Sequence, residues 1–146
     1  MCIRDRSVII PVYNAERFIE KSYNSIINQQ IDDFEIIYVN NNSIDNTQLE
    51  IDRISTKDAR VTSFFQKKQG TSFARNLGIS KASGDYVYIF DVDDEIYPNA
   101  LKKMLEVLDN DKNMDAVFGK MVKSSKSISD TIKPVSYTHL TLPTIA

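Results

Sequence analysis

The sequence predicts an α/β fold built on a mostly parallel β-sheet with helices on both faces. Short apolar runs rich in β-branched residues alternate with segments whose apolar side chains recur at helical spacing. Turn-forming residues such as Asn, Gly and Pro separate many of these segments. Strands that alternate with helices at short spacing imply right-handed crossovers, and therefore parallel pairing of the strands.

The first half of the chain contains two strand–helix units. Residues 7–12 form an apolar, β-branched run that ends at Pro11 and a turn, which predicts a strand buried on both faces. Residues 16–29 carry apolar side chains at helical spacing, which predicts a helix packed on the sheet. Residues 34–39 predict the second strand, and residues 45–55 predict a weaker helix. The apolar positions of that helix are Leu49, Ile51 and Ile54.

The next unit has the same organisation. Residues 61–65 predict the third strand, and residues 72–82 predict the third helix. We expect Thr71 or Ser72 to cap the start of this helix and Gly84 to stop its end. The residues expected to face inward are Phe73, Ala74 and Leu77.

The fourth strand, residues 86–90, runs directly into an acidic cluster. Pro98 is expected to open the fourth helix, and residues 116–118 begin a fifth strand. The apolar face of the fourth helix consists of Leu101, Met104, Leu105 and Leu108. In parallel sheets ligands bind beyond the carboxyl ends of the strands, so the turns that follow the strands define the candidate site.

The two ends of the chain differ from the body between them. Residues 1–6 carry no apolar period, and residues 135–146 form an uncharged, Thr-rich run. Both resemble translated adaptor sequence, so we expect a foreign leader, a partial domain over residues 7–134 and a foreign tail. The only cysteine, Cys2, and the only histidine, His139, lie in these ends. The body therefore excludes thiol nucleophiles, Cys/His zinc sites and Ser-His-Asp triads.

Bulk electrostatics identify no partner. A formal net charge of -2 and a pI near 5.4 give no basic footprint for nucleic acid or anionic lipid. No apolar stretch approaches the roughly 20 residues that span a bilayer. We expect a cytoplasmic protein with no nucleic-acid partner, which is at most peripheral at the inner face of the membrane.

Three carboxylates follow the fourth strand, at Asp91, Asp93 and Asp94. They repel one another unless they are protonated, solvated or shared with a cation. Mg²⁺ or Mn²⁺ resolves the repulsion, because these ions take oxygen ligands, typically one or two carboxylates together with water and substrate phosphates. A solvated acidic turn is the alternative that the spacing leaves open. Gly-rich phosphate loops do not occur in the sequence, which disfavours dinucleotide oxidoreductases and P-loop NTPases.

Other turns bring polar groups to the same edge of the sheet. Arg75 lies in the first turns of the third helix, where free N–H groups favour anions, and its guanidinium can grip phosphate through two donors. Tyr13 offers a ring face and residues 40–42 offer amides, which could together stack on and hydrogen-bond a nucleobase. Each of these features alone is as typical of a surface helix or an ordinary turn.

Four segments of the chain, taken in their order along the sequence, resemble the N-terminal half of family 2 glycosyltransferases with the GT-A fold. The resemblance implies a Rossmann-like nucleotide-binding half that is truncated here. Residues 7–14 resemble the family's opening strand and base-binding turn, and residues 34–45 resemble its second strand and acidic loop. Residues 70–78 resemble the segment before the metal strand, and residues 84–94 resemble that strand with its D-x-D motif.

The resemblance also implies roles for individual side chains. The implied substrate-binding residues are Pro11, Tyr13, Asn41, Arg75, Asp91 and Asp93, and the implied metal ligands are Asp93, Asp91 and Asp94. The first three contact the nucleobase, Arg75 the nucleotide, Asp91 the ribose or a metal-bound water, and Asp93 the ion on the diphosphate. Where this chain has Asn41, the family usually has an aspartate that accepts a hydrogen bond from the base. An Asn oxygen can still accept that bond, but the substitution removes a charge and adds donors.

The activity implied by the resemblance is the inverting transfer of a sugar from a nucleoside-diphosphate donor, expected to be a UDP-sugar, to an acceptor hydroxyl in polysaccharide or glycan synthesis. Mg²⁺ or Mn²⁺ would stabilise the departing diphosphate. In the family, the carboxylate that deprotonates the acceptor lies in the later half, beyond residue 134. We therefore expect this chain to bind the donor only, and a glycan or lipid-linked acceptor to require the missing half.

Two alternatives from other classes remain. Residues 90–93 also resemble the strand-end motif of haloacid-dehalogenase-like phosphatases. That motif normally follows the first strand, however, and Glu95 stands where Thr or Val is expected. The other alternative is a non-catalytic α/β binding module, or a fragment whose apolar sheet edge is left unpaired.

Overall fold

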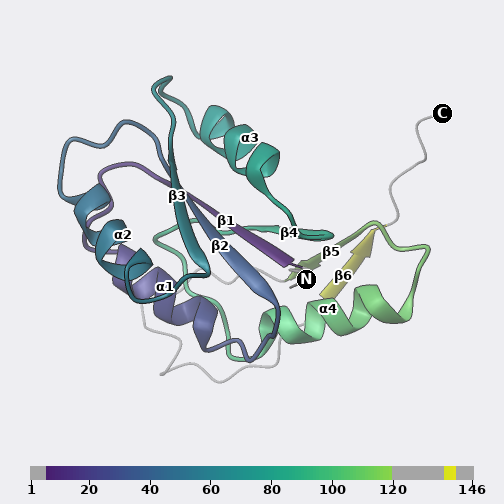
Figure 1. The fold of residues 1–146 in the computed structure, drawn as a ribbon. Coiled ribbons are helices and arrows are strands. Elements are labelled where there is room, and N and C mark those ends of the chain that lie inside the picture. Colours follow the sequence, from purple (N-terminus) through teal and green to yellow (C-terminus); the bar gives the residue numbers. More distant parts are fainter. Residues whose placement is uncertain (1–5, 120–136, 141–146) are drawn as a thin grey trace. The chain divides into compact units, whose positions relative to one another are not determined.

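The computed structural model describes residues 6–119 and 137–140 (Figure 1). The chain divides into two compact units, one made of residues 1–24 and 32–94 and the other of residues 25–31 and 95–146. The first unit contains the parallel sheet and every residue of the predicted site.

The sheet of the first unit has four parallel strands in the order β3-β2-β1-β4, which confirms the predicted α/β fold (Figure 1). The strands are β1 (Arg6–Val12), β2 (Phe34–Asn40), β3 (Val61–Phe65) and β4 (Tyr86–Ile89). The two central strands are the most buried, and β2 is buried along its whole length. Their bounds agree with the sequence prediction to within one residue, because continuous β-branched runs are typical of strands covered on both faces.

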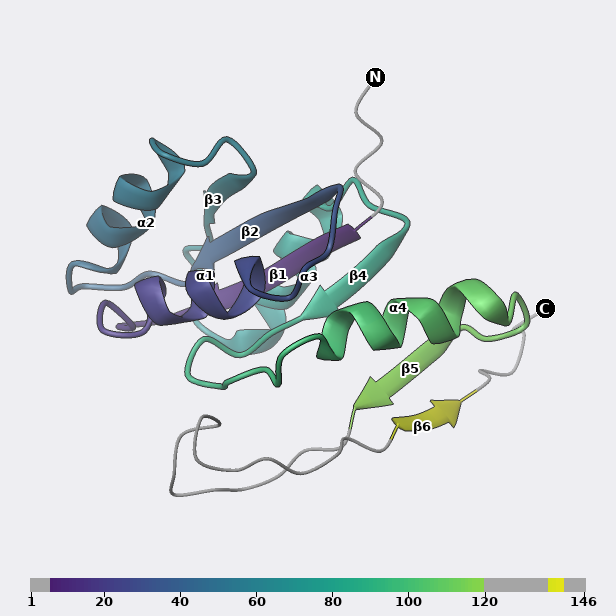
Figure 2. The same cartoon turned by 90° about the horizontal axis from the view of Figure 1, so that it is seen from below.

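Helices cover both faces of this sheet, as predicted. They are α1 (Ile19–Ile27), α2 (Thr47–Ser55) and α3 (Thr71–Lys81). On one face, the Tyr38 hydroxyl lies 2.8 Å from the Ser22 hydroxyl and donates to the Ile19 carbonyl of α1 at 3.3 Å. On the other face, Ile9 packs with Ala74 of α3 in a buried cluster. Figure 2 shows α1 and α3 on opposite sides of β1 and β2.

The close approach of α3 to the sheet depends on a small residue. A Cβ atom at Gly78 would lie 2.3 Å from Ile9 Cγ2 and 3.2 Å from Val39 Cγ2. The buried face of α3 is therefore made of Ala74 and Gly78, and the expectation that Phe73 faces inward is wrong, since 38% of it is exposed. A bulky side chain cannot enter an interface this narrow.

Two predictions about the ends of α3 are also wrong. The N-cap is Gly70, with φ of +135°, and no side-chain hydrogen bond caps the helix at this position. At the other end, Gly84 lies beyond the C-cap, Ala82. A Cβ at Gly84 would lie 2.7 Å from the backbone of Arg6, so this glycine permits close contact with β1 rather than stopping the helix.

Strand β4 is less buried than the sequence suggests. Val87 is 45% exposed and Ile89 38%, whereas the paired residues of β1, Ser7 and Ile9, are fully buried. The reason is position, since β4 lies at the end of the strand order and α3 packs on β1 and β2. In the same way Leu49 of α2 is 65% exposed, while Ile51 and Ile54 are buried as predicted.

A buried carboxylate anchors the loop between α3 and β4. Glu35 Oε1 accepts hydrogen bonds of 2.7 Å from the Ser7 hydroxyl, the Ser83 hydroxyl and the Ser83 N–H. The Ser7 hydroxyl in turn accepts from the Gly84 N–H at 2.9 Å. These bonds hold the loop that leads into β4 and hence into the acidic turn.

We expect Glu35→Ala to lower the free energy of unfolding by about 2–3 kcal/mol, because it leaves the buried Ser7 hydroxyl and both donors of Ser83 without their charged acceptor. Glu35→Gln keeps an acceptor oxygen at the same place, so it should lose clearly less. Urea unfolding of the two variants measures the difference. Equal losses would show that the hydrogen bonds do not contribute to stability.

The second unit contains α4 (Ala100–Asn110) and a two-stranded antiparallel sheet of β5 (Ala116–Gly119) and β6 (Tyr137–Leu140). The predicted fifth strand therefore exists, but it pairs antiparallel with β6. Helix α4 begins two residues after Pro98, because Asn99 has φ of +62°. Gln29 supports this start, since its Oε1 accepts from the Leu101 N–H at 3.1 Å and its Nε2 donates to the Tyr97 carbonyl at 3.2 Å.

In the part of the chain that the structure describes, every helix is too short or too polar to cross a bilayer. Residues 1–5 and most of the Thr-rich tail lie outside the described residues, and the foreign origin of both ends stays a prediction. The four tail residues of β6 are described through their pairing with β5.

Candidate functional site

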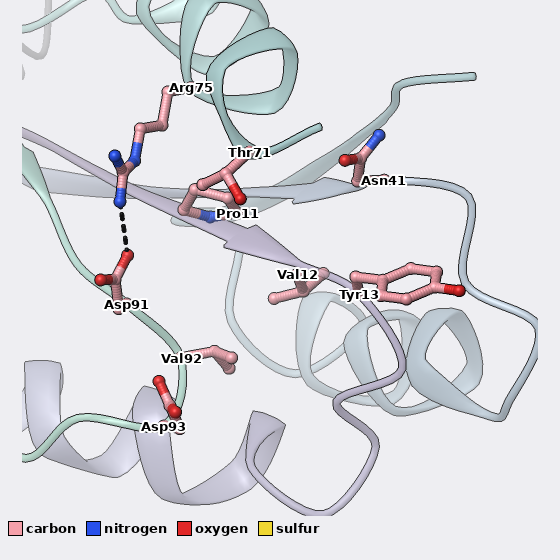
Figure 3. Close-up of a pocket in the computed structure, with 9 residues that line it drawn as sticks. All are labelled: Pro11, Val12, Tyr13, Asn41, Thr71, Arg75, Asp91, Val92 and Asp93. Carbon is pink, nitrogen blue, oxygen red and sulfur yellow. Dashed lines mark hydrogen bonds and ion pairs between the residues drawn. The ribbon is translucent and has the colours of Figure 1, made fainter. Parts of the chain in front are cut away.

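A pocket of about 240 Å³ opens at the carboxyl edge of the sheet in the first unit (Figure 3). The loops after β1, β2 and β4 contribute to it, and the segment after β3 contributes through the first turns of α3. It is lined by Pro11, Val12, Tyr13, Asn41, Thr71, Arg75, Asp91, Val92 and Asp93. The pocket therefore brings together all six residues predicted to bind substrate. Asp94, predicted as a further metal ligand, is not among the lining residues.

The pocket also contains three residues that the sequence analysis did not select. Val12 and Val92 supply apolar surface beside Tyr13 and Asp91. Thr71 was considered only as a helix cap, although its position at the first turn of α3 is the same signal that selected Arg75.

The exit of β1 presents Pro11 and Tyr13 to the pocket. The Ile9 carbonyl accepts from the Phe90 N–H at 2.9 Å, so Pro11, two residues further along, faces the same side of the strand. Strand β4 ends at Ile89, so no residue of that strand lies opposite Pro11. The sheet therefore loses no hydrogen bond through the missing N–H of the proline. Tyr13 is 52% exposed, and Figure 3 shows its ring directed away from Arg75 and Asp91.

The loop after β1 is tied to the loop after β2. The Asn14 N–H donates to the Ser43 hydroxyl at 3.0 Å, and Asn14 Oδ1 accepts from the Ile44 N–H at 2.9 Å. The Ala15 N–H donates to the Thr47 hydroxyl at 2.8 Å. The backbone that follows Tyr13 is therefore fastened to the loop after β2 and to the start of α2.

Asp45 stabilises the contact between the loops after β1 and β2, and it does not line the pocket. It accepts from the Thr47 N–H at 3.0 Å and from the Glu16 N–H at 3.2 Å. Burial by itself raises the pKa of Asp45, but the hydrogen bonds from Thr47 and Glu16 outweigh it, so the net pKa is lowered. The carboxylate is thus kept charged by bonds that serve the loop structure.

Asn41 lies at the opposite side of the pocket from the acidic turn and is 4% exposed. Its Nδ2 donates to the Gln66 carbonyl at 3.0 Å and to the Lys68 carbonyl at 2.7 Å. Its Oδ1 accepts from the Gly70 N–H at 2.9 Å. Both amide hydrogens are therefore used within the protein, and the side chain can offer a ligand only a remaining lone pair of the oxygen.

Arg75 reaches across the pocket to Asp91 (Figure 3). Its Nη2 lies 3.0 Å from Asp91 Oδ1, and the two side chains are 39% and 51% exposed. Arg75 Nε is buried and has no hydrogen-bond partner in the described part of the chain. The Asp91 contact occupies only one of the guanidinium nitrogens, so this partly exposed group keeps donor capacity that an anion in the pocket could use.

The acidic cluster is a tight turn in which the Asp94 N–H donates to the Asp91 carbonyl at 3.0 Å. Burial raises the pKa of Asp94, and the neighbouring Asp93 and Asp91 carboxylates raise it further. Burial, together with Asp94 and Asp91, also raises the pKa of Tyr88 to about 12. The carboxylates of Asp91, Asp93 and Asp94 therefore concentrate negative charge at this turn, and the turn contains no positive charge to balance it.

The acidic turn suits a divalent cation that is held by one or two of its carboxylates rather than by all three. Among the described residues, no three acidic, His or Cys side chains are gathered closely enough to hold a metal by themselves. The three carboxylates thus do not converge, since Asp91 is directed at Arg75 and Asp94 lies away from the pocket lining. Asp93 faces the pocket beside Asp91, which fits Mg²⁺ or Mn²⁺ bound through one or two carboxylates with ligand phosphates supplying further oxygens.

This pocket at the carboxyl ends of parallel strands, with an aromatic ring, an arginine and acidic residues, is typical of proteins that bind a phosphorylated nucleotide in an α/β fold. The model of the family "Glycosyl transferase family 2" matches residues 7–141, and the chain belongs to that family. The predicted resemblance is thereby confirmed. The haloacid-dehalogenase alternative is not supported, since the aspartates follow β4 rather than the first strand.

The relatives include a Campylobacter jejuni protein named GalNAc(5)-diNAcBac-PP-undecaprenol beta-1,3-glucosyltransferase. It is 36% identical over 102 residues, which are 68% of this chain and 33% of that protein. The chain spans between 15% and 41% of the length of this protein and two other curated relatives, both named as uncharacterized glycosyltransferases.

Two solved structures share the fold. The S. aureus TarS structure with UDP-GlcNAc has 27% identity and a TM-score of 0.66, over 83% of this chain and 37% of that one. Glucosyl-3-phosphoglycerate synthase from Mycobacterium tuberculosis, in complex with Mn2+, UDP and phosphoglyceric acid, has 25% identity and a TM-score of 0.54, over 72% and 38%. Both likenesses confirm the GT-A fold of the first unit's sheet and helices.

Proposed function

We propose that this chain is the donor-binding part of an inverting glycosyltransferase that uses a nucleoside-diphosphate sugar, with a UDP-sugar as the preferred donor. The observation that carries the proposal is one pocket that collects Tyr13 from the loop after β1, Arg75 from α3 and Asp93 from the turn after β4. A nucleoside diphosphate needs a surface for the base and countercharges for the phosphates, and this pocket offers both. TarS, which is similar to this chain, binds UDP-GlcNAc.

Each side chain has a place in the proposed complex. The exposed ring of Tyr13 stacks on the base, and Pro11 and Asn41, which also line the pocket, contact the base as well. Arg75 binds the nucleotide through donors that Asp91 does not use. Asp91 contacts the ribose or a metal-bound water, and Asp93 holds the cation.

The cation is Mg²⁺ or Mn²⁺, in keeping with the Mn2+ of the mycobacterial synthase. When bound, it stabilises negative charge on the departing diphosphate. The protein's own contribution is to neutralise and orient that diphosphate with Arg75, while the Asp93 carboxylate beside it holds the cation.

The acceptor is a glycan or a lipid-linked glycan, and the Campylobacter jejuni relative carries an undecaprenol-linked acceptor in its name. The group that deprotonates the acceptor hydroxyl belongs to a part of the protein outside this chain. We therefore propose that this chain binds the donor without transferring the sugar, and that the whole enzyme works in the cytoplasm, at the inner face of the membrane when its acceptor is lipid-linked.

Thermal unfolding tests the proposal. UDP with Mn²⁺ should stabilise the chain by about 2.7 kcal/mol when the ligand is present at 100 times its dissociation constant, because only the folded state binds it. UDP with a chelator should give a much smaller shift. A simple phosphomonoester serves as the control, since a phosphatase-like site would respond to it. Equal protection by UDP and the phosphomonoester, or none by UDP with Mn²⁺, would contradict a nucleotide-sugar site.

A further inference from the structure

The side chain of Asn41 makes three hydrogen bonds to one short backbone segment, residues 66–70. The bonds reach the Gln66 and Lys68 carbonyls and the Gly70 N–H, at 3.0, 2.7 and 2.9 Å. The main chain of Asn41 adds a contact, because its carbonyl accepts from Gln69 Nε2 at 2.9 Å. Residue 41 is thus the principal attachment of this segment to the end of β2.

These bonds fix the chemistry required at position 41. The two carbonyls need donors and the Gly70 N–H needs an acceptor, so only one orientation of the carboxamide satisfies all three. A carboxylate has no hydrogen to donate, and its oxygen would face the Lys68 carbonyl at 2.7 Å. An aspartate at this position cannot hold the segment in this conformation.

The clamped segment leads directly into the binding side of α3. Gly70 is the N-cap of α3 and has φ of +135°. Thr71, the next residue, and Arg75, one turn later, both line the pocket. Because no side chain caps α3 at Gly70, the bond from the Gly70 N–H to Asn41 fixes where the helix begins relative to β2.

We propose that Asn41 is a positioning residue, whose carboxamide clamps residues 66–70 and so sets Thr71 and Arg75 at the pocket. The proposal rests on the proposed function, because the positioned groups are those that would contact the nucleotide. The proposal also explains what the two amide hydrogens of an asparagine do at position 41. Both are hydrogen-bonded to the Gln66 and Lys68 carbonyls, so the side chain presents only an acceptor to the base, as an aspartate would.

The test compares Asn41→Asp with Asn40→Asp. Asn40 is a matched control, since it is 3% exposed, also uses its amide internally, toward Gln48 Oε1 at 2.9 Å, and does not line the pocket. Hydrogen exchange of the Gly70 amide is measured first, without ligand. We expect exchange at least tenfold faster in Asn41→Asp than in the parent chain, and near the parent rate in Asn40→Asp.

UDP binding with Mn²⁺ is then measured by calorimetry on the same proteins. Asn41→Asp should bind at least tenfold more weakly than Asn40→Asp. Asn41→Ala, which removes the clamp without burying a charge, serves if the aspartate variant does not fold, and should show the same two effects. Unchanged Gly70 exchange or unchanged affinity in both Asn41 variants would overturn the proposal. Failure of the parent chain to bind UDP would refute the proposed function instead, and the exchange rates would still decide whether the clamp exists.

Discussion

Replacing Arg75 by glutamine is expected to weaken binding of UDP and Mn²⁺ by about 10- to 150-fold, with little change in folding stability. Hydrogen bonds to charged groups are worth about 1.5–3 kcal/mol, which corresponds to this range of affinity. The Arg75–Asp91 pair, by contrast, is 39% and 51% exposed, and exposed pairs stabilise a fold by about 0–1 kcal/mol. The substitution should therefore separate affinity from stability.

Arg53→Gln is the matched control for this experiment. It removes the same charge from an arginine that is 46% exposed and pairs with Glu50 and Glu20 on helices away from the pocket. Calorimetric titration with UDP and Mn²⁺, with thermal unfolding of the same samples, gives both quantities. If Arg75→Gln and Arg53→Gln bind UDP equally well, Arg75 does not contact the nucleotide and its bond to Asp91 is only a surface ion pair.

The order of the elements could be predicted from the sequence because local patterning decides it. The β-branched run of residues 34–39 has one way to bury its side chains on both faces, and it forms the fully buried β2. The residues at the carboxyl edge were predictable for a related reason. Once the strands are parallel, Tyr13, Arg75 and Asp93 must lie near one another, wherever they stand in the sequence.

Other features depend on contacts between residues far apart in the chain. The hydrogen bonds of Asn41 join it to residues 25 to 29 positions away, and no spacing in the sequence announces them. The bond between Arg75 and Asp91 is of the same kind. The inward face of α3 was misjudged because hydrophobicity favoured Phe73, whereas the distance between helix and sheet favours glycine.

The antiparallel pairing of β5 was missed for another reason. A short apolar run predicts a strand but not its partner, and an alternation of strands and helices favours a parallel one. The partner found here, β6, lies in a segment of polar and aromatic residues that carries no strand pattern of its own.

Gly78→Ala is the second substitution expected to have a large effect, this time on stability. In an isolated helix alanine is favoured over glycine by about 1 kcal/mol. Here the added Cβ would lie 2.3 Å from Ile9 Cγ2, closer than real carbon contacts allow, and overpacking of this kind costs about 1–3 kcal/mol or more. Because Ile9 lies in a central strand and cannot move away, the packing cost should exceed the helical gain, with a net loss of about 2 kcal/mol in urea unfolding.

The mechanism of that loss can be separated from a general intolerance of alanine. At Gly119 a Cβ would meet its nearest atom, Met104 Sδ, at 3.6 Å, so Gly119→Ala should be close to neutral. Ile9→Ala removes the methyl group that the new Cβ would strike, so the double variant should lose less stability than the sum of the two single losses. Additive losses would show that the crowding is relieved elsewhere. A coupled result would mean that contact between α3 and the sheet sets the depth of the helix, and with it the reach of Arg75 into the pocket.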